Sequence, residues 1–135
     1  MAITVTQTIA DTSYRTTVKY INNAAANTDV NILDCSGLSG YQVGGLVNLA
    51  KISWWSSAPS GGLDLIWHAT SNVIAFICEG ASGTYGFMPG QPAITNSTAA
   101  AGRTGDVYIT NATATFTLVI EYHKVPNSLG VGWGA

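Results

Sequence analysis

The sequence is a succession of short apolar runs separated by clusters of Gly, Asn, Ser and Ala, and no window repeats its apolar residues with the period of a helix. Runs of this length, with turn signals at intervals of about 10 residues, are typical of β-sandwiches. We therefore expect an all-β fold, an antiparallel, jelly-roll-like β-sandwich of about eight or nine strands, although this spacing does not distinguish a jelly roll from an immunoglobulin-like topology. The expected strands begin at Ile3, Tyr14, Asp29, Leu46, Leu63, Val73, Thr84, Gly105 and Thr115.

The chain length fits one domain, and the composition changes near its end. A chain of 135 residues that is 47% hydrophobic can bury one sizeable core. The final stretch, PNSLGVGWGA, combines three glycines with a proline and is unsuited to a strand or a helix. We expect a β-sandwich domain over residues 1–125 and a Gly-rich C-terminal tail over residues 126–135.

Charged residues are scarce, at 9% of the chain with a formal net charge of −2, whereas an ordinary soluble domain has about 25%. Few charges mean little repulsion between copies, which favours a protein that works in an assembly. The five Lys and Arg residues are scattered along the sequence, so nucleic acid is not an expected partner.

Export and membrane insertion are not expected. The start, MAITVTQTIADTSYR, lacks the cationic and apolar regions of a secretory signal, and no later segment approaches about 18 continuous apolar residues. Cys35 and Cys78 lie in strand-like stretches and are expected to be free, buried thiols. The N-x-T sequons at Asn96 and Asn111 are then chance matches in a Thr-rich chain.

Two adjacent tryptophans occur in the stretch KISWWSSAPSGGLDLIWHATSN. Successive side chains of a strand point to opposite faces, so Trp54 and Trp55 do not both enter the core. Lys51 shares its face with Trp55, which predicts that Trp55 points outward and Trp54 inward. The expected core contains Val18, Tyr20, Trp54, Trp67, Phe116, Leu118 and Ile120.

The strand from Leu63 is expected to form a hairpin with the tryptophan strand, which directs Trp67 into the core. Ile66 and His68 then lie on the outer face beside Trp55. An outward Trp next to an Ile is a small apolar patch of the kind that forms subunit contacts. We therefore expect Trp55 and Ile66 to bind a protein partner.

Two further segments indicate contacts with other proteins. Residues 73–78, VIAFIC, are apolar on both faces, which predicts a central strand covered outside by a loop or by a neighbouring subunit. Trp133 lies in the tail with glycines on both sides, where no local element is expected to bury it. We therefore expect Trp133 to dock into a partner, the alternative being a disordered chain end.

No catalytic or metal-binding arrangement is expected. Asp64 and His68 are about 13 Å apart along one strand, too far for the acid of a triad with Ser53 to orient the histidine. Glu121 and His123 are about 7 Å apart along one strand face and would need further ligands to hold a metal. The sequence therefore predicts a protein that is not an enzyme and has no cofactor and no metal.

Carbohydrate binding is the main rival function, since β-sandwiches commonly bind sugars on aromatic platforms. Trp55, Tyr85 and Trp133 are the candidate platforms. A cluster of amides or carboxylates at one rim, which would complete such a site, cannot be located in the sequence.

Three stretches, KISWWSSAPSGGLDLIWHATSN, ITNSTAAAGRTGDVYIT and ATFTLVIEYHKV, make the chain similar to small virion proteins of tailed bacteriophages, in particular the capsid decoration or cement proteins. The resemblance implies a β-sandwich that binds the major capsid protein on the outer capsid surface, as a homo-oligomer and most often a trimer. It also implies a virion location after synthesis in the host cytoplasm. No site residue is carried over from it, and a small tail or fibre component fits the composition nearly as well.

Overall fold

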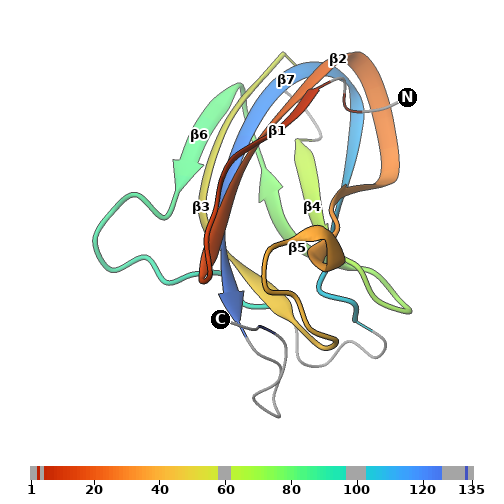
Figure 1. The fold of residues 1–135 in the computed structure, drawn as a ribbon. Coiled ribbons are helices and arrows are strands. Elements are labelled where there is room, and N and C mark those ends of the chain that lie inside the picture. The colour runs from red at the N-terminus through yellow and green to blue at the C-terminus, as the bar shows by residue number, and fades with distance from the viewer. Residues whose placement is uncertain (1–2, 4, 58–61, 97–102, 126–132, 134–135) are drawn as a thin grey trace.

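The computed structural model describes residues 3, 5–57, 62–96, 103–125 and 133, and within them the fold is all-β and antiparallel, which confirms the predicted class. The described residues form seven strands and one short 3-10 helix, η1 (Cys35–Gly37), arranged as in Figure 1. The strands are β1 (Val5–Asp11), β2 (Arg15–Leu33), β3 (Leu46–Ser56), β4 (Leu63–Trp67), β5 (Val73–Cys78), β6 (Ser82–Tyr85) and β7 (Val107–Val125).

Seven strands are described rather than eight or nine, because two pairs of expected strands are each continuous. The runs from Tyr14 and Asp29 join in β2, and those from Gly105 and Thr115 join in β7. The joining segments are rich in Asn, Ala and Thr, which in sequence indicates a turn. In β2 the backbone instead continues through bulges, with shifts of register against β7 and positive φ angles at Ala24 (51°) and Asp29 (48°).

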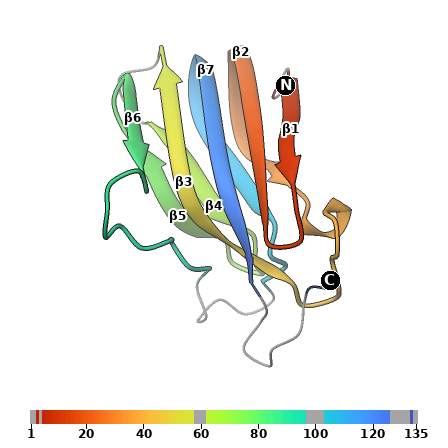
Figure 2. The same ribbon diagram turned by 60° about the vertical axis from the view of Figure 1, so that its left-hand side comes forward.

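The two long strands belong to both layers of the molecule. The hydrogen-bonded order is β1-β2-β7-β3-β6, with β4 paired to β7 and β5 paired to β4. The first half of β2 and the last half of β7 form one layer with β1, β3 and β6, which stands in front in Figure 2. Their other halves form the second layer with β4 and β5. One sheet thus folds back on itself around a single core.

The core contains the residues that alternation predicted. Trp54 is partly buried and packs against the core, while the other six predicted core residues are buried. The hydroxyl groups of Tyr20 and Tyr122 are hydrogen-bonded to each other at 2.8 Å inside the core. Burial raises the pKa of both phenols above the ordinary value. Cys35 and Cys78 are free and buried, as expected.

Three buried asparagines, Asn22, Asn27 and Asn111, lie where β2 and β7 bend from one layer to the other. The amide of Asn27 donates to Asn111 Oδ1 at 2.7 Å, and the amide of Asn22 donates to the carbonyls of Ala25 and Ala114 at 2.8 and 2.7 Å. These bonds replace ladder bonds that the bulges interrupt. We call these three residues the asparagine cluster. Because Asn111 is buried within it, the sequon at that position is not available on the surface.

The predicted hairpin between the tryptophan strand and the strand from Leu63 is wrong. β3 pairs with β6 and β7, whereas β4 pairs with β5 and β7, so the two strands lie in different layers. Alternation within β3 and β4 nevertheless gave the correct faces, since Trp55 is 54% exposed and Trp67 only 2%. The pattern determines which face a side chain takes but not which strand lies beside it.

The expectation that residues 73–78 form a central strand is also wrong. Among the described residues β5 pairs only with β4, so it is an edge strand. Ile74 and Ile77 are 56% and 42% exposed. The double-sided apolar pattern arises here from a strand whose outer face is not covered by the described part of its own chain.

Candidate binding face

The residues weighed for catalysis are not brought together. Ser53 lies on β3 in one layer, while Asp64 and His68 lie in the other. The imidazole of His68 is hydrogen-bonded to Thr104 Oγ1 at 3.0 Å and stacks on the ring of Tyr108 at 4.3 Å. Within the described ranges no group of three or more His, Cys, Asp or Glu side chains could hold a metal ion. Those ranges also contain no helix with the length and apolar character to cross a membrane.

The most prominent candidate site is the outer face of the layer formed by β1, β2, β7, β3 and β6. Strand pairing aligns outward residues in rows across it, for example Lys51 with Glu121 and Trp55 with Thr117. We call this surface the Trp55 face. It is defined by Arg15, Thr17, Lys19 and Ile21 of β2, by Lys51, Ser53 and Trp55 of β3, by Thr117, Val119, Glu121 and His123 of β7, and by Phe87 at its rim.

Trp55 is the most exposed aromatic side chain on the described strands of this face. Its strand neighbours are Thr117 on β7 and Ser82 on β6, whose side chains are small. The indole therefore rises above small neighbouring side chains, with 54% of its area exposed. A tryptophan in this setting offers a large apolar area to a partner at little cost in side-chain entropy. The outward position predicted for Trp55 is confirmed.

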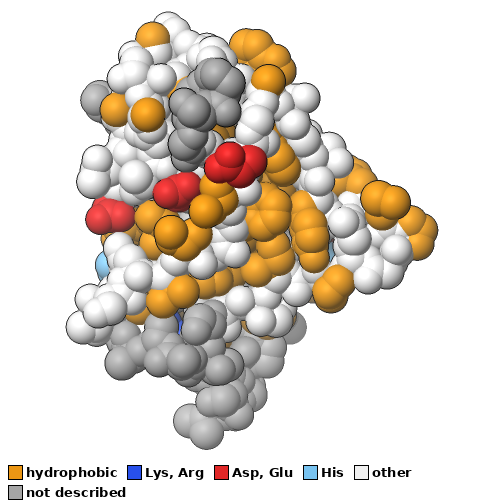
Figure 3. Space-filling view, turned by 180° about the vertical axis from the view of Figure 1, so that it is seen from behind, with side chains coloured by type: hydrophobic (Ala, Val, Ile, Leu, Met, Phe, Trp, Pro, Cys, Tyr) orange, Lys and Arg blue, Asp and Glu red, His pale blue; other side chains and the backbone are white. Residues whose placement is uncertain are grey.

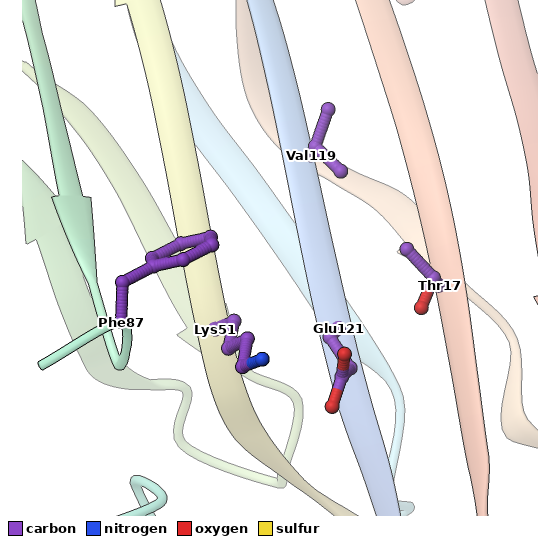
Figure 4. Close-up of a pocket in the computed structure, with 5 residues that line it drawn as sticks. All are labelled: Thr17, Lys51, Phe87, Val119 and Glu121. Carbon is purple, nitrogen blue, oxygen red and sulfur yellow. The ribbon is translucent and has the colours of Figure 1, made fainter. Parts of the chain in front are cut away.

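A pocket of about 240 Å³ lies on the same face, lined by Thr17, Lys51, Phe87, Val119 and Glu121. Figure 4 shows four of these side chains projecting from neighbouring strands, with Phe87 reaching over β3 from the segment that follows β6. The ammonium group of Lys51 lies 5.5 Å from the centre of the Phe87 ring, a cation–π contact.

Phe87 was not predicted as a site residue, and its position depends on the preceding glycine. Gly86 has a φ of +89°, and a Cβ there would lie 2.0 Å from the carbonyl oxygen of Ala50. Only glycine allows the chain to leave β6 so close to β3 and to turn the next side chain over the sheet. The feature of the sequence that could have indicated Phe87 is the apolar pair Phe87-Met88 within a turn sequence rich in Gly and Pro.

The Trp55 face is cationic although the chain is acidic. Arg15, Lys19 and Lys51 lie on it with a single carboxylate, Glu121, which gives a net charge of +2 on a chain of net charge −2. Glu121 lies 2.9 Å from His123 Nε2 and 3.8 Å from Arg15 Nη1. Glu121 and His123, which we expected about 7 Å apart along the strand, instead contact each other directly on the strand surface.

Ile66 does not contribute to this face. It belongs to β4 in the opposite layer and is only 6% exposed. Ile74 and Tyr108 are its partners on the two neighbouring strands, and their side chains flank it on the same outer surface. The predicted patch of Trp55 and Ile66 is therefore wrong, because it depended on the hairpin that does not form.

Trp133 lies against its own chain, so the expectation that no local element would hold it is wrong. Its indole N–H donates to the carbonyls of Val125 and Leu46 at 2.9 and 3.0 Å, and its ring packs edge-on against Tyr41. Strand ends leave carbonyl groups unpaired, and the indole N–H satisfies two of them. The remaining tail positions, 126–132 and 134–135, lie outside the described residues.

A buried lysine, Lys124, lies next to Trp133. The ammonium group of Lys124 donates to Asp11 Oδ1, to the carbonyl of Thr12 and to the carbonyl of Ser39, at 2.5, 2.6 and 2.8 Å. It also lies 5.2 Å from the centre of the Trp133 ring. All three protons of the ammonium are satisfied, which offsets the cost of burying its charge.

Of the three candidate sugar platforms, Trp55 alone is largely exposed. Tyr85 is partly buried against Phe76, with its hydroxyl donating to the carbonyl of Pro92 at 2.8 Å. Trp133 is partly buried as described above.

Comparison with known proteins assigns no family, since no family model, curated protein or solved structure matches the chain.

Proposed function

We propose that the protein is a non-enzymatic structural protein that binds a larger assembly through the Trp55 face. The observation that carries this proposal is the exposed indole of Trp55 on a cationic sheet face, in a chain with only 9% charged residues. Large exposed aromatics supported by a rigid sheet are typical anchors of protein interfaces.

The resemblance to phage virion proteins supplies the proposed assembly. The protein decorates the outer surface of a bacteriophage capsid, binds the major capsid protein, and stabilises the shell as a homo-oligomer, with a trimer as the expected state. It is made in the host cytoplasm and ends in the virion. The pocket between Phe87 and Val119 receives an apolar side chain of the partner, and the cations of the face select an acidic surface.

Binding to particles tests the proposal directly. Purified capsids are mixed with the full-length protein or with Trp55→Ala, and bound protein is measured after sedimentation of the particles. The variant should bind at least tenfold more weakly, because interface anchors of this kind contribute about 2 kcal/mol or more.

Val43→Ala is the matched control, since Val43 is 85% exposed and lies in the loop before β3, away from the strands of the Trp55 face. It should bind like the wild type. Equal retention of the Trp55 variant and the control would contradict the proposed binding face. Imaging of the particles then distinguishes the capsid surface from a tail or fibre position.

Carbohydrate binding remains the second candidate, favoured by one arrangement on the same face. The indole of Trp55 has hydroxyl-bearing neighbours in Ser82 and Thr117, and the pocket that contains Lys51 and Glu121 lies further along the same strands, where Lys51 is about 13 Å from Trp55 along β3. A sugar ring stacks on an indole while hydroxyl and charged groups bind its edge. Glycan-array binding by the isolated protein, lost in Trp55→Ala, would favour this function over capsid binding.

A further inference from the structure

The second layer carries an outer face whose character is opposite to that of the Trp55 face. Asp64 is paired with Ile77 on one side and with Thr110 on the other, and Thr110 Oγ1 lies 3.4 Å from Asp29 Oδ1. Figure 3 shows hydrophobic side chains gathered over one side of the molecule with acidic side chains beside them. We call this surface the isoleucine face. It is defined by Asp29, Asp64, Ile66, Ile74, Ile77, Glu79, Tyr108 and Thr110.

Acidic groups form a row along this face. The carboxylate of Glu79 is placed there because Gly62 lies against both Ile77 and Glu79, as a Cβ on Gly62 would be 3.1 Å from Ile77 Cγ2 and 3.2 Å from Glu79 Oε1. Asp29, Asp64 and Glu79 thus follow one another from β2 to the end of β5. The defined residues give the isoleucine face a net charge of −3.

The apolar part of the same face lies on an open sheet edge. Ile74 and Ile77 are 56% and 42% exposed, and β5 pairs only with β4 in the described part of the chain. The strand has no charged residue and no proline, the two features that commonly protect an edge from association. An edge of this kind next to exposed isoleucines is suited to a protein contact.

We propose that the Trp55 face of one copy binds the isoleucine face of a second copy. The inference rests on the homo-oligomer in the proposed function and identifies the surfaces that form it. Trp55 and Val119 meet Ile74 and Ile77, while Lys19 and Lys51 meet Asp64 and Glu79. Opposite charges guide the two faces together and fix their orientation.

The charges also favour this pairing over the contacts between like faces. Two isoleucine faces would bring one acidic row against another, and two Trp55 faces would bring cations together, both of which are unfavourable. A second copy is favoured over a foreign acidic protein because this chain itself carries the complementary acidic and apolar surface. Contacts between unlike faces join copies head to tail. In an open trimer of this kind the terminal copy keeps a free Trp55 face, which is the face that binds the capsid in the proposed function.

Charge reversal on one face and then on both faces tests the inference. Lys19→Glu with Lys51→Glu changes the net charge of the Trp55 face from +2 to −2, and Asp64→Lys with Glu79→Lys changes that of the isoleucine face from −3 to +1. Sedimentation velocity at low and high salt measures the association of the full-length protein. Protein concentrations from about 1 to about 100 μM cover the micromolar dissociation constants that are expected for small interfaces.

The wild type should associate, and each single-face variant should associate at least tenfold more weakly, with the difference reduced at high salt. The variant reversed on both faces should recover association, since its faces are again opposite in charge. Trp55→Ala should also weaken association. Thermal unfolding of every variant verifies that the fold is kept.

Three outcomes would overturn the inference. They are a wild type that stays monomeric at about 100 μM, single-face variants that associate normally, and a doubly reversed variant that does not recover association. Association that resists charge reversal but is lost in Ile74→Pro would indicate pairing of β5 edges instead. The capsid function is measured separately on particles. A monomer that still binds capsids through Trp55 leaves the proposed function intact, whereas self-association without capsid binding contradicts that function alone.

Discussion

Trp55 and Trp67 show how position decides what one residue type contributes. Both are tryptophans on strands of the same sheet, but Trp67 is 2% exposed in the core and Trp55 is 54% exposed on the outer face. Removing the first leaves a large cavity among packed side chains, whereas removing the second leaves only solvent.

We therefore expect Trp67→Ala to lower the free energy of unfolding by about 3 to 5 kcal/mol and Trp55→Ala by less than about 0.5 kcal/mol. Urea denaturation of the two variants, followed by circular dichroism, measures both values. A loss below about 1 kcal/mol for Trp67→Ala would place its side chain outside the core. This pair also separates stability from binding, because only Trp55→Ala should affect capsid retention.

At this scale the sequence was a good guide to faces and a poor guide to neighbours. Period-two alternation predicted that Trp54 and Trp67 point inward and Trp55 outward, because alternation is a local property of the extended backbone. Phe87 was missed because its place over Lys51 depends on the left-handed backbone of Gly86. The hydrogen bonds of Trp133 were missed for a similar reason, since they depend on carbonyls at distant strand ends.

The elements that define this fold are β2 and β7, each 19 residues long and shared by both layers. The sequence predicted each as two strands, because Asn and Ala clusters normally mark turns. In the folded chain the same asparagines are the residues that hold the bend. An asparagine cluster in the sequence can thus mark either a turn or a bend within a continuous strand. Which of the two forms depends on the hydrogen-bond partners that the other strand contributes.

The asparagine cluster offers the sharpest test at the scale of elements. Asn27→Ala removes the donor to Asn111 Oδ1 and leaves that buried oxygen without this partner, so we expect a loss of about 1 to 3 kcal/mol in the free energy of unfolding. Asn23→Ala, at an exposed neighbouring position, is the control and should change it by less than about 0.5 kcal/mol. Equal unfolding midpoints for the two variants would show that the cluster does not support the bend.

At the scale of the whole molecule, groups buried in the core should make the folded state less stable at alkaline pH. Burial raises the pKa of the Cys35 and Cys78 thiols to about 12 and raises the pKa of the Tyr20 and Tyr122 phenols. The unfolded chain releases these protons at their ordinary pKa values, so above them the folded state binds more protons than the unfolded state. The free energy of unfolding therefore keeps its full value below about pH 9 and falls as the pH rises towards 12.

Urea midpoints measured at pH 7, 9, 10 and 11 should thus fall steeply only at the two highest values, by the linkage between proton binding and stability. Cys78→Ala, which lacks one of these groups, should show a shallower fall than the wild type. A midpoint that stays constant up to pH 11 would contradict the inference that the folded state keeps these protons at a pH where the unfolded chain releases them.

The pairing of β2 with β7 also has a consequence for synthesis. β2 lies near the start of the chain and its main partner, β7, extends to Val125. During translation β2 leaves the ribosome with its β7 edge unpaired, and that edge stays unpaired until the residues up to Val125 have been made. Closing so long a loop is slow compared with local pairing, and an unpaired strand edge is open to wrong partners in the meantime. The β2–β7 ladder therefore forms only after β7 has been made, and until then the open edge of β2 is exposed to chaperones as well as to wrong partners.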